Sequence, residues 1–139
     1  MILWEKRWPK FHPRELLSPE GLEHFAKGHM VMQPDFLDKL HAFREFLGLE
    51  FLINHGKLKL RGWRSWAENL SIDGKLYHPL GVAADVTVKD TPSAVVADEA
   101  LKFGFHGVGV YDTFCHIDLR PRLDEHVFRW DFRTKKDNL

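Results

Sequence analysis

Apolar residues recur at helical spacing in two parts of the chain. One run, over 34–47, opens at Pro34, ends before Gly48, and carries its apolar side chains at Phe36, Leu40, Phe43 and Leu47. A second run, with apolar side chains at Val95, Val96, Ala100, Leu101 and Phe103, ends at Gly104 and follows Thr91-Pro92-Ser93, which offers an N-cap and a proline in the first turn. Residues 9–34 are broken by prolines and favour loop, with one short helix at 19–26. The pattern therefore predicts two amphipathic helices and one shorter helix.

Shorter apolar or alternating runs predict strands. They lie at 51–53, 57–60, 81–88, 107–111, 114–119 and 127–132. The last three are joined by short connections, whereas parallel neighbours need long crossovers, so the sheet should be mainly antiparallel. We therefore expect a single α+β domain spanning 1–139, with helices packed on one side of a small sheet.

Composition and charge change this picture little. Lys plus Arg and Asp plus Glu number 20 each, and 44% of the residues are hydrophobic. A neutral chain of this kind creates no field that would favour nucleic acid or an anionic membrane as a partner. The N-terminus lacks an apolar run of signal-peptide length, and no segment approaches a membrane span. These features predict a cytoplasmic monomer.

Candidate chemistry gathers in two segments, His78-Pro79-Leu80-Gly81-Val82-Ala83-Ala84-Asp85 and Phe114-Cys115-His116-Ile117-Asp118-Leu119-Arg120. Two imidazoles and one carboxylate are the ligand composition of a catalytic zinc site, which keeps a fourth position for water. The sequence thus predicts a Zn²⁺ site at His78, Asp85 and His116. The alternative is that no metal binds, because the chain has nine histidines and each could have a structural role.

The strand around His116 adds further expectations. Asp118 lies two residues on, so both side chains leave the same face, and Asp118 could serve as general base or orient a zinc ligand. Cys115, the single cysteine, should point to the opposite face as a small buried residue. The five tryptophans are expected to anchor the core, with Trp63 and Trp66 as candidates for the site because they flank Arg64.

Several of these residues resemble the motifs of the zinc D-alanyl-D-alanine peptidases, a family related to hedgehog domains and to phage L-alanyl-D-glutamate endolysins. The resembling residues are Gly62-Trp63-Arg64-Ser65, Asn69, Gly74, His78, Gly81, Ala83, Asp85, Gly109-Val110-Tyr111 and Phe114-Cys115-His116-Ile117-Asp118. The likeness runs from about Phe11 to Arg120 and implies the hedgehog-like fold. It also implies zinc ligands at His78, Asp85 and His116, and a substrate carbonyl or carboxylate held by Arg64.

The chain departs from the family pattern at three positions. Arg61 and Leu76 stand where the motifs have serine, and Thr113 stands where many catalytic members have an acid. Another residue must therefore serve as the general base. Asp118 is the first candidate and Asp112 the second.

Two functions follow from the resemblance. The first is zinc-dependent hydrolysis of amide bonds in peptidoglycan stem peptides, by a carboxypeptidase or an endolysin-type endopeptidase that a phage holin releases to the cell wall. The second, which Thr113 keeps open, is a non-catalytic zinc-binding module that recognises cell wall or belongs to a phage structure.

Overall fold

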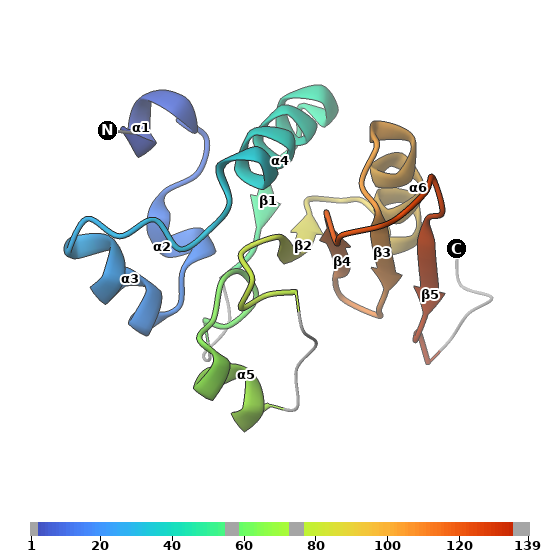
Figure 1. The fold of residues 1–139 in the computed structure, drawn as a ribbon. Coiled ribbons are helices and arrows are strands. Elements are labelled where there is room, and N and C mark those ends of the chain that lie inside the picture. Colours follow the sequence, from blue (N-terminus) through green and yellow to red (C-terminus); the bar gives the residue numbers. More distant parts are fainter. Residues whose placement is uncertain (1–2, 55–58, 73–76, 135–139) are drawn as a thin grey trace.

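The computed structural model describes residues 3–54, 59–72 and 77–134, and it has an α+β architecture (Figure 1). The helices are α1 Trp4–Arg7, α2 Pro13–Leu16, α3 Pro19–Ala26, α4 Pro34–Leu47, α5 Trp66–Ser71 and α6 Ser93–Phe103. The strands are β1 Phe51–Leu52, β2 Ala83–Val88, β3 Gly107–Val110, β4 Cys115–Asp118 and β5 Phe128–Asp131. The expected helices at 19–26 and 34–47, and the expected helix that ends at Gly104, are therefore confirmed.

The five strands form one mixed sheet in the order β1-β2-β4-β3-β5. Three of the neighbouring pairs are antiparallel, as expected, but β3 and β5 run parallel. The expectation of antiparallel neighbours considered only strands that follow one another along the chain. The partner of β5 is β3, and residues 111–127, which include β4, supply the crossover that a parallel pair requires.

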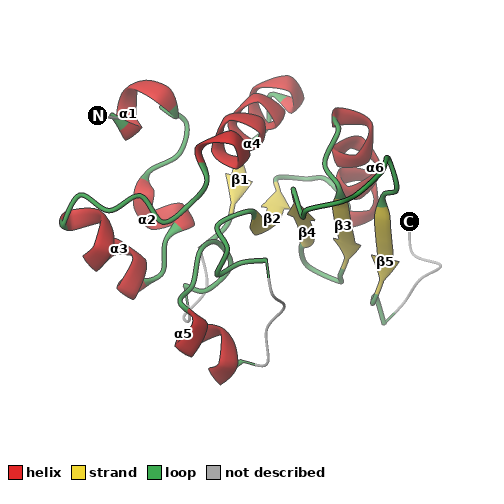
Figure 2. Ribbon diagram, viewed as in Figure 1, coloured by secondary structure: helices red, strands yellow, loops and turns green. Residues whose placement is uncertain are grey.

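The two faces of the sheet differ sharply in character. Alternate residues of the central strands enter the hydrophobic core, namely Ala84, Val86, Val88, Val108, Val110, Cys115 and Ile117. Helix α6 covers this face, as the ribbon coloured by secondary structure shows (Figure 2). Cys115 is fully buried there, as expected, and burial raises the pKa of its thiol. The opposite face carries Asp85, His116 and Asp118.

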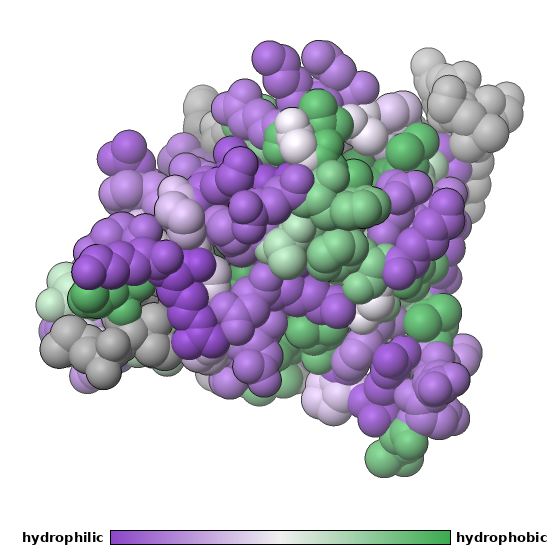
Figure 3. All heavy atoms as spheres, turned by 90° about the horizontal axis from the view of Figure 1, so that it is seen from above, coloured by the Kyte–Doolittle hydropathy of each residue, from purple (hydrophilic) through white to green (hydrophobic). Residues whose placement is uncertain are grey.

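Aromatic packing joins α4 to this core. The ring centroid of Phe43 lies 5.8 Å from that of Phe51 and 5.5 Å from that of Phe105. Further along α4, Phe46 is 64% exposed and its ring lies 5.5 Å from Phe103 of α6. Seen from above, hydrophobic side chains gather over this part of the molecule between hydrophilic ones (Figure 3). Helices α4 and α6 thus share the hydrophobic core with the face of the sheet that lies opposite Asp85.

Several local expectations need correction. Strand β2 begins at Ala83 rather than Gly81, because Gly81 has φ +78° and lies in a turn. In the expected strand 57–60, residues 57–58 lie outside the described part and 59–60 are not in a strand. Helix α6 begins after Pro92 without a side-chain cap, and the Thr91 hydroxyl donates instead to the carbonyl of Lys89. Helices α1, α2 and α5 were not predicted.

Within the described residues, no helix is long and apolar enough to cross a membrane.

Candidate metal centre

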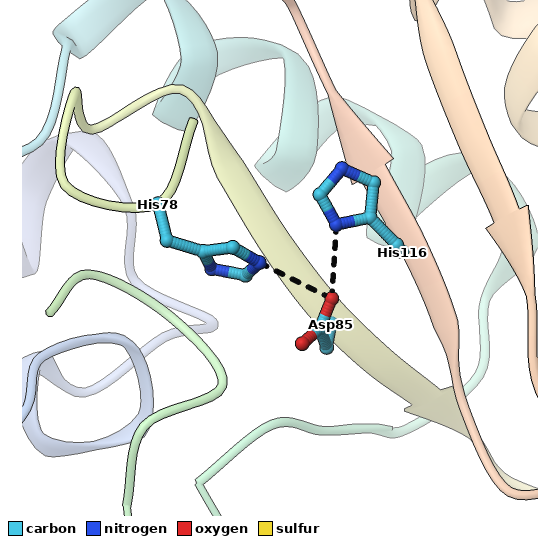
Figure 4. Close-up of side chains that lie close together, drawn as sticks. All are labelled: His78, Asp85 and His116. Carbon is cyan, nitrogen blue, oxygen red and sulfur yellow. Dashed lines mark hydrogen bonds and ion pairs between the residues drawn. The ribbon is translucent and has the colours of Figure 1, made fainter. Parts of the chain in front are cut away.

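Strand pairing brings two of the predicted ligands together. In the register of β2 with β4, Asp85 lies directly opposite His116 and Ala83 lies opposite Asp118. Residues that face each other across an antiparallel pair project on the same side of the sheet. His78 joins them from the turn that precedes β2, so all three side chains converge (Figure 4).

The three side chains are close enough to share one ion. Oδ1 of Asp85 lies 3.3 Å from Nε2 of His78 and 3.1 Å from Nδ1 of His116. One ligand atom from each residue lies within 4.8 Å of the other two. His78 is 1% exposed and His116 is 3% exposed. The described residues therefore contain a buried cluster that could hold a metal ion, and its two nitrogens and one oxygen suit Zn²⁺.

Each histidine uses its other ring nitrogen for a hydrogen bond inside the protein. Nδ1 of His78 lies 2.9 Å from the carbonyl oxygen of Gly62, to which it must donate. Nε2 of His116 lies 2.7 Å from Oδ2 of Asp118 and donates to that carboxylate. These bonds leave Nε2 of His78 and Nδ1 of His116 as the nitrogens that face Asp85, and both would be available to an ion held between the three side chains, which is the usual arrangement behind metal-binding histidines.

Burial and pairing set the protonation of the cluster. Burial lowers the pKa of His78. For His116, burial also lowers the pKa, but hydrogen bonds to Asp118 and Asp85 outweigh it and raise the pKa. Burial tends to raise the pKa of Asp85, yet the two histidines hold it well below its usual range. The carboxylate is therefore ionised, as a metal ligand must be.

Asp118 lies behind His116 in a tight ion pair with Arg120. Its side chain has no exposed surface, and Oδ2 accepts from Nη2 of Arg120 at 2.7 Å as well as from His116. Oδ1 accepts from the backbone N–H and from Nε of Arg120, both at 3.0 Å. Burial tends to raise the pKa of Asp118, but the hydrogen bonds from His116 and Arg120 lower it to about 2. Of the two roles expected for Asp118, this geometry suits the orientation of a ligand.

Aromatic rings surround the guanidinium of Arg120, a residue to which the sequence analysis gave no role. The carbon Cζ lies 4.5 Å from the ring centroid of Tyr77, 4.9 Å from that of Phe128 and 5.1 Å from that of Trp130. The ring of Trp130 also lies 5.2 Å from that of His116. The alternation His116, Asp118, Arg120 was the available sequence signal, because three polar residues at every second position share one face of a strand.

Two glycines of β3 make this arrangement possible. Gly109 pairs with His116, and a Cβ there would lie 2.4 Å from the ring of Trp130. Gly107 pairs with Asp118, and a Cβ there would lie 2.6 Å from Nε of Arg120. Any side chain at these positions would displace the groups that cover the ligand-bearing strand.

Arg64 lies inside the protein close to the cluster. Its residue is 5% exposed, Nε donates to Oδ1 of Asn69 at 2.7 Å, and Nη1 donates to the carbonyl of Leu60 at 2.7 Å. Burial lowers the pKa of Arg64, and the charge of Asp85 acts against that shift. The guanidinium is thus held by neighbouring polar groups and not by the surface ion pair that is common for arginine.

The remaining predicted residues lie apart from the three ligands or on the surface. Asp112 is exposed, and its carboxylate oxygens accept from the backbone N–H and the hydroxyl of Thr134, both at 3.0 Å. Trp63 is buried and its Nε1 donates to the carbonyl of Pro79, next to His78. Trp66 is 51% exposed. Among the described residues, Asp112 therefore bonds to Thr134 and not to His78, Asp85 or His116.

Comparisons with known proteins do not identify the chain. No family model matches it, and neither the curated proteins nor the solved structures contain a match.

The stability of the metal-free protein is expected to fall in acid because of Asp118. Its pKa of about 2 lies below the usual value, so its stabilising effect is complete above about pH 4 and is lost as pH falls through about 2. The shift corresponds to about 2 kcal/mol. Urea unfolding between pH 6 and pH 2 measures this effect, and Asp118→Asn should flatten the acid branch. An acid branch of the same steepness in the variant would contradict the assignment.

Proposed function

We propose that the protein is a zinc-dependent peptidase that hydrolyses amide bonds in peptidoglycan stem peptides, with a fold like that of the hedgehog domains and D-alanyl-D-alanine peptidases. The observation that carries this proposal is the convergence of His78, Asp85 and His116 on one buried point. The same three residues occupy the ligand positions of the motifs that the sequence resembles. Geometry and sequence pattern thus support the same set independently.

The proposed chemistry divides between the ion and the side chains around it. When bound, Zn²⁺ polarises the scissile carbonyl and lowers the pKa of water toward about 7. His78, Asp85 and His116 hold the ion, while Asp118 and Arg120 keep His116 in the required tautomer and orientation.

Arg64 is the proposed contact for a substrate carbonyl or terminal carboxylate. Its Nε and Nη1 are committed to Asn69 and Leu60, which fixes the plane of the guanidinium. The second terminal nitrogen, Nη2, makes no hydrogen bond to another described residue, so it is the atom proposed to meet the substrate.

Hydrolysis also requires a proton acceptor. Asp118 is a poor one, because its pKa is about 2 and both of its oxygens already accept hydrogen bonds. We therefore propose Asp112 for this role, since it is the exposed carboxylate in the turn between β3 and β4, beside the strand that carries His116. To act in this way, Asp112 must give up its bonds with Thr134 and approach the three ligands, from which it lies apart in this structure.

A second candidate function is a zinc-stabilised module that binds cell wall or a phage component without cutting it. The specific observation in its favour is that both candidate bases already have partners. Asp118 forms an ion pair with Arg120, and Asp112 accepts hydrogen bonds from Thr134. Thr113, at the position of the family's acid, is exposed and cannot replace a carboxylate.

Purified cell walls distinguish the two functions. The peptidase should release either free D-alanine, as a carboxypeptidase, or new amino termini, as an endopeptidase, and a chelator should abolish the release. Asp112→Asn should retain zinc and lose hydrolysis, whereas His12→Ala, at an exposed histidine, should change neither. If the protein sediments with the cell walls and releases no amine from them, the result would favour the binding module. Because the substrate lies outside the cytoplasmic membrane, the proposal includes release by another factor such as a phage holin.

A further inference from the structure

Two histidines outside the candidate centre face each other at the end of α3. Nδ1 of His24 lies 3.4 Å from Nδ1 of His29. His24 is half-buried and His29 is exposed, so solvent reaches the pair. In a neutral pair, one ring must donate a proton to the other, and two protonated rings would repel each other.

The backbone at the end of α3 holds the two rings in this arrangement. The N–H of His29 donates to the carbonyl of His24 at 2.9 Å, and the N–H of Gly28 donates to the carbonyl of Phe25 at 2.9 Å. Gly28 has φ +83°, the left-handed conformation that ends many helices in this type of hydrogen-bonded turn. The turn therefore brings two residues five positions apart onto the same side of the chain.

Trp63 fixes the ring of His24 from the other side. The two ring centroids lie 6.0 Å apart with an interplanar angle of 84°, an edge-to-face contact. Trp63 itself is buried and is bonded to the carbonyl of Pro79. The buried ring of Trp63 thus supports the ring of His24 and fixes the direction of its Nδ1.

The distance between the nitrogens matches a shared metal ion. Two zinc–nitrogen bonds of about 2.0–2.1 Å that meet at a tetrahedral angle place their nitrogens about 3.3–3.4 Å apart. The observed separation is 3.4 Å. Imidazole nitrogen suits Zn²⁺, Ni²⁺ and Cu²⁺ and is a weaker choice for Mg²⁺ or Ca²⁺, which prefer oxygen.

We infer that His24 and His29 form a second site, for a divalent transition metal such as Zn²⁺ or Ni²⁺. Binding requires only that the ring whose Nδ1 carries the proton change tautomer, so that the proton leaves Nδ1 and Nε2 takes one from solvent. With two protein ligands, the site leaves further coordination positions to water, so it should bind more weakly than the three-ligand centre at His78, Asp85 and His116. An ion here would lie beside Trp63, because the ring of His24 contacts that of Trp63, whose Nε1 donates to the carbonyl of Pro79 next to His78.

Calorimetric titration of the chelator-stripped full-length protein with ZnCl₂ tests this inference. The wild-type protein should show a tight and a weaker binding event, and His29→Ala should lose the weaker one and keep the tight one. His116→Ala should show the reverse, so that a failure of the second site is distinguishable from a failure of the proposed centre. His12→Ala is the matched control, because it removes an exposed histidine at the start of α2, where its Nδ1 accepts from the backbone N–H of Arg14, and it should keep both events.

A second measurement identifies the atoms involved. Long-range ¹H–¹⁵N spectra of the imidazoles should show Zn²⁺ shifting Nδ1 of both His24 and His29. His24→Asn should abolish these shifts at His29 while the circular dichroism spectrum stays unchanged. Equal stoichiometry in wild-type protein and His29→Ala, or spectra that place the bound ion at Nε2 of these rings, would overturn the inference.

Discussion

Replacing His116 with alanine is expected to lower the affinity of the candidate centre for Zn²⁺ by at least about 100-fold. The change removes one of three ligands, and removal of even an outer partner of a ligand typically costs about 10–100-fold. The fold should persist, since Asp118 keeps its ion pair with Arg120 and is not left as an isolated buried charge. Hydrolysis of cell walls should be lost together with the metal.

Competition with a chromophoric chelator measures the Zn²⁺ affinity of the candidate centre, which is the tighter of the two binding events. His12→Ala provides the control, because His12 is exposed and its ring accepts from the backbone of α2 and not from a residue of the candidate centre. Unchanged tight binding in His116→Ala would remove this residue from the ligand set. Loss of binding with intact cell-wall hydrolysis would instead separate the metal from the activity.

Asp118→Ala should destabilise the protein by about 3–5 kcal/mol, the usual cost of removing one partner from a buried ion pair. The Arg120 guanidinium and the Nε2–H of His116 would both lose their acceptor, and their side chains are only 14% and 4% exposed. Zinc affinity should also fall, because His116 would no longer be held with Nδ1 toward Asp85. Chemical unfolding of the metal-free protein measures the first effect and zinc competition the second.

The chain contains a matched control for this variant. Asp131 and Arg133 repeat the same two-residue spacing, with Arg133 donating from its backbone N–H and from its guanidinium to the Asp131 carboxylate. The side chain of Asp131 is 21% exposed and that of Asp118 is fully buried, and Asp118 also accepts from His116. Asp131→Ala should therefore cost much less stability and leave zinc affinity unchanged. Equal losses in the two variants would show that burial beside His116 is not the cause.

The sequence was sufficient to predict that His78, Asp85 and His116 come together, but not the groups around them. Alternation places Asp85 on one face of its own strand, and the two-residue spacing places His116 and Asp118 together on one face of theirs. Only the pairing that brings these two faces to the same side of the sheet remained to be assumed. The role of Arg120 depends on Tyr77, Phe128 and Trp130, which come from distant parts of the chain. No local pattern encodes such a cluster of side chains.

The missed elements have identifiable physical causes. Helix α5 opens with a capping box, in which Ser65 accepts from the N–H of Glu68 and the Glu68 carboxylate accepts from the N–H of Ser65. This signal was present in the sequence, but the segment lacks the apolar periodicity by which longer helices are recognised. The parallel pairing of β5 had no local signal, since it depends on which edge of the sheet is free after β4 has paired.

The ligands of the candidate centre lie far apart along the chain, and an ion between them would close a long covalent loop. His78 and His116 enclose about 40 residues, and a cross-link over a loop of that length reduces the entropy of the unfolded chain by an amount worth about 4 kcal/mol at 25 °C. A chain with a single cysteine cannot form an intrachain disulfide. The metal would therefore take over the task of a disulfide here, and chelation would act on this protein as reduction acts on a disulfide-bonded one.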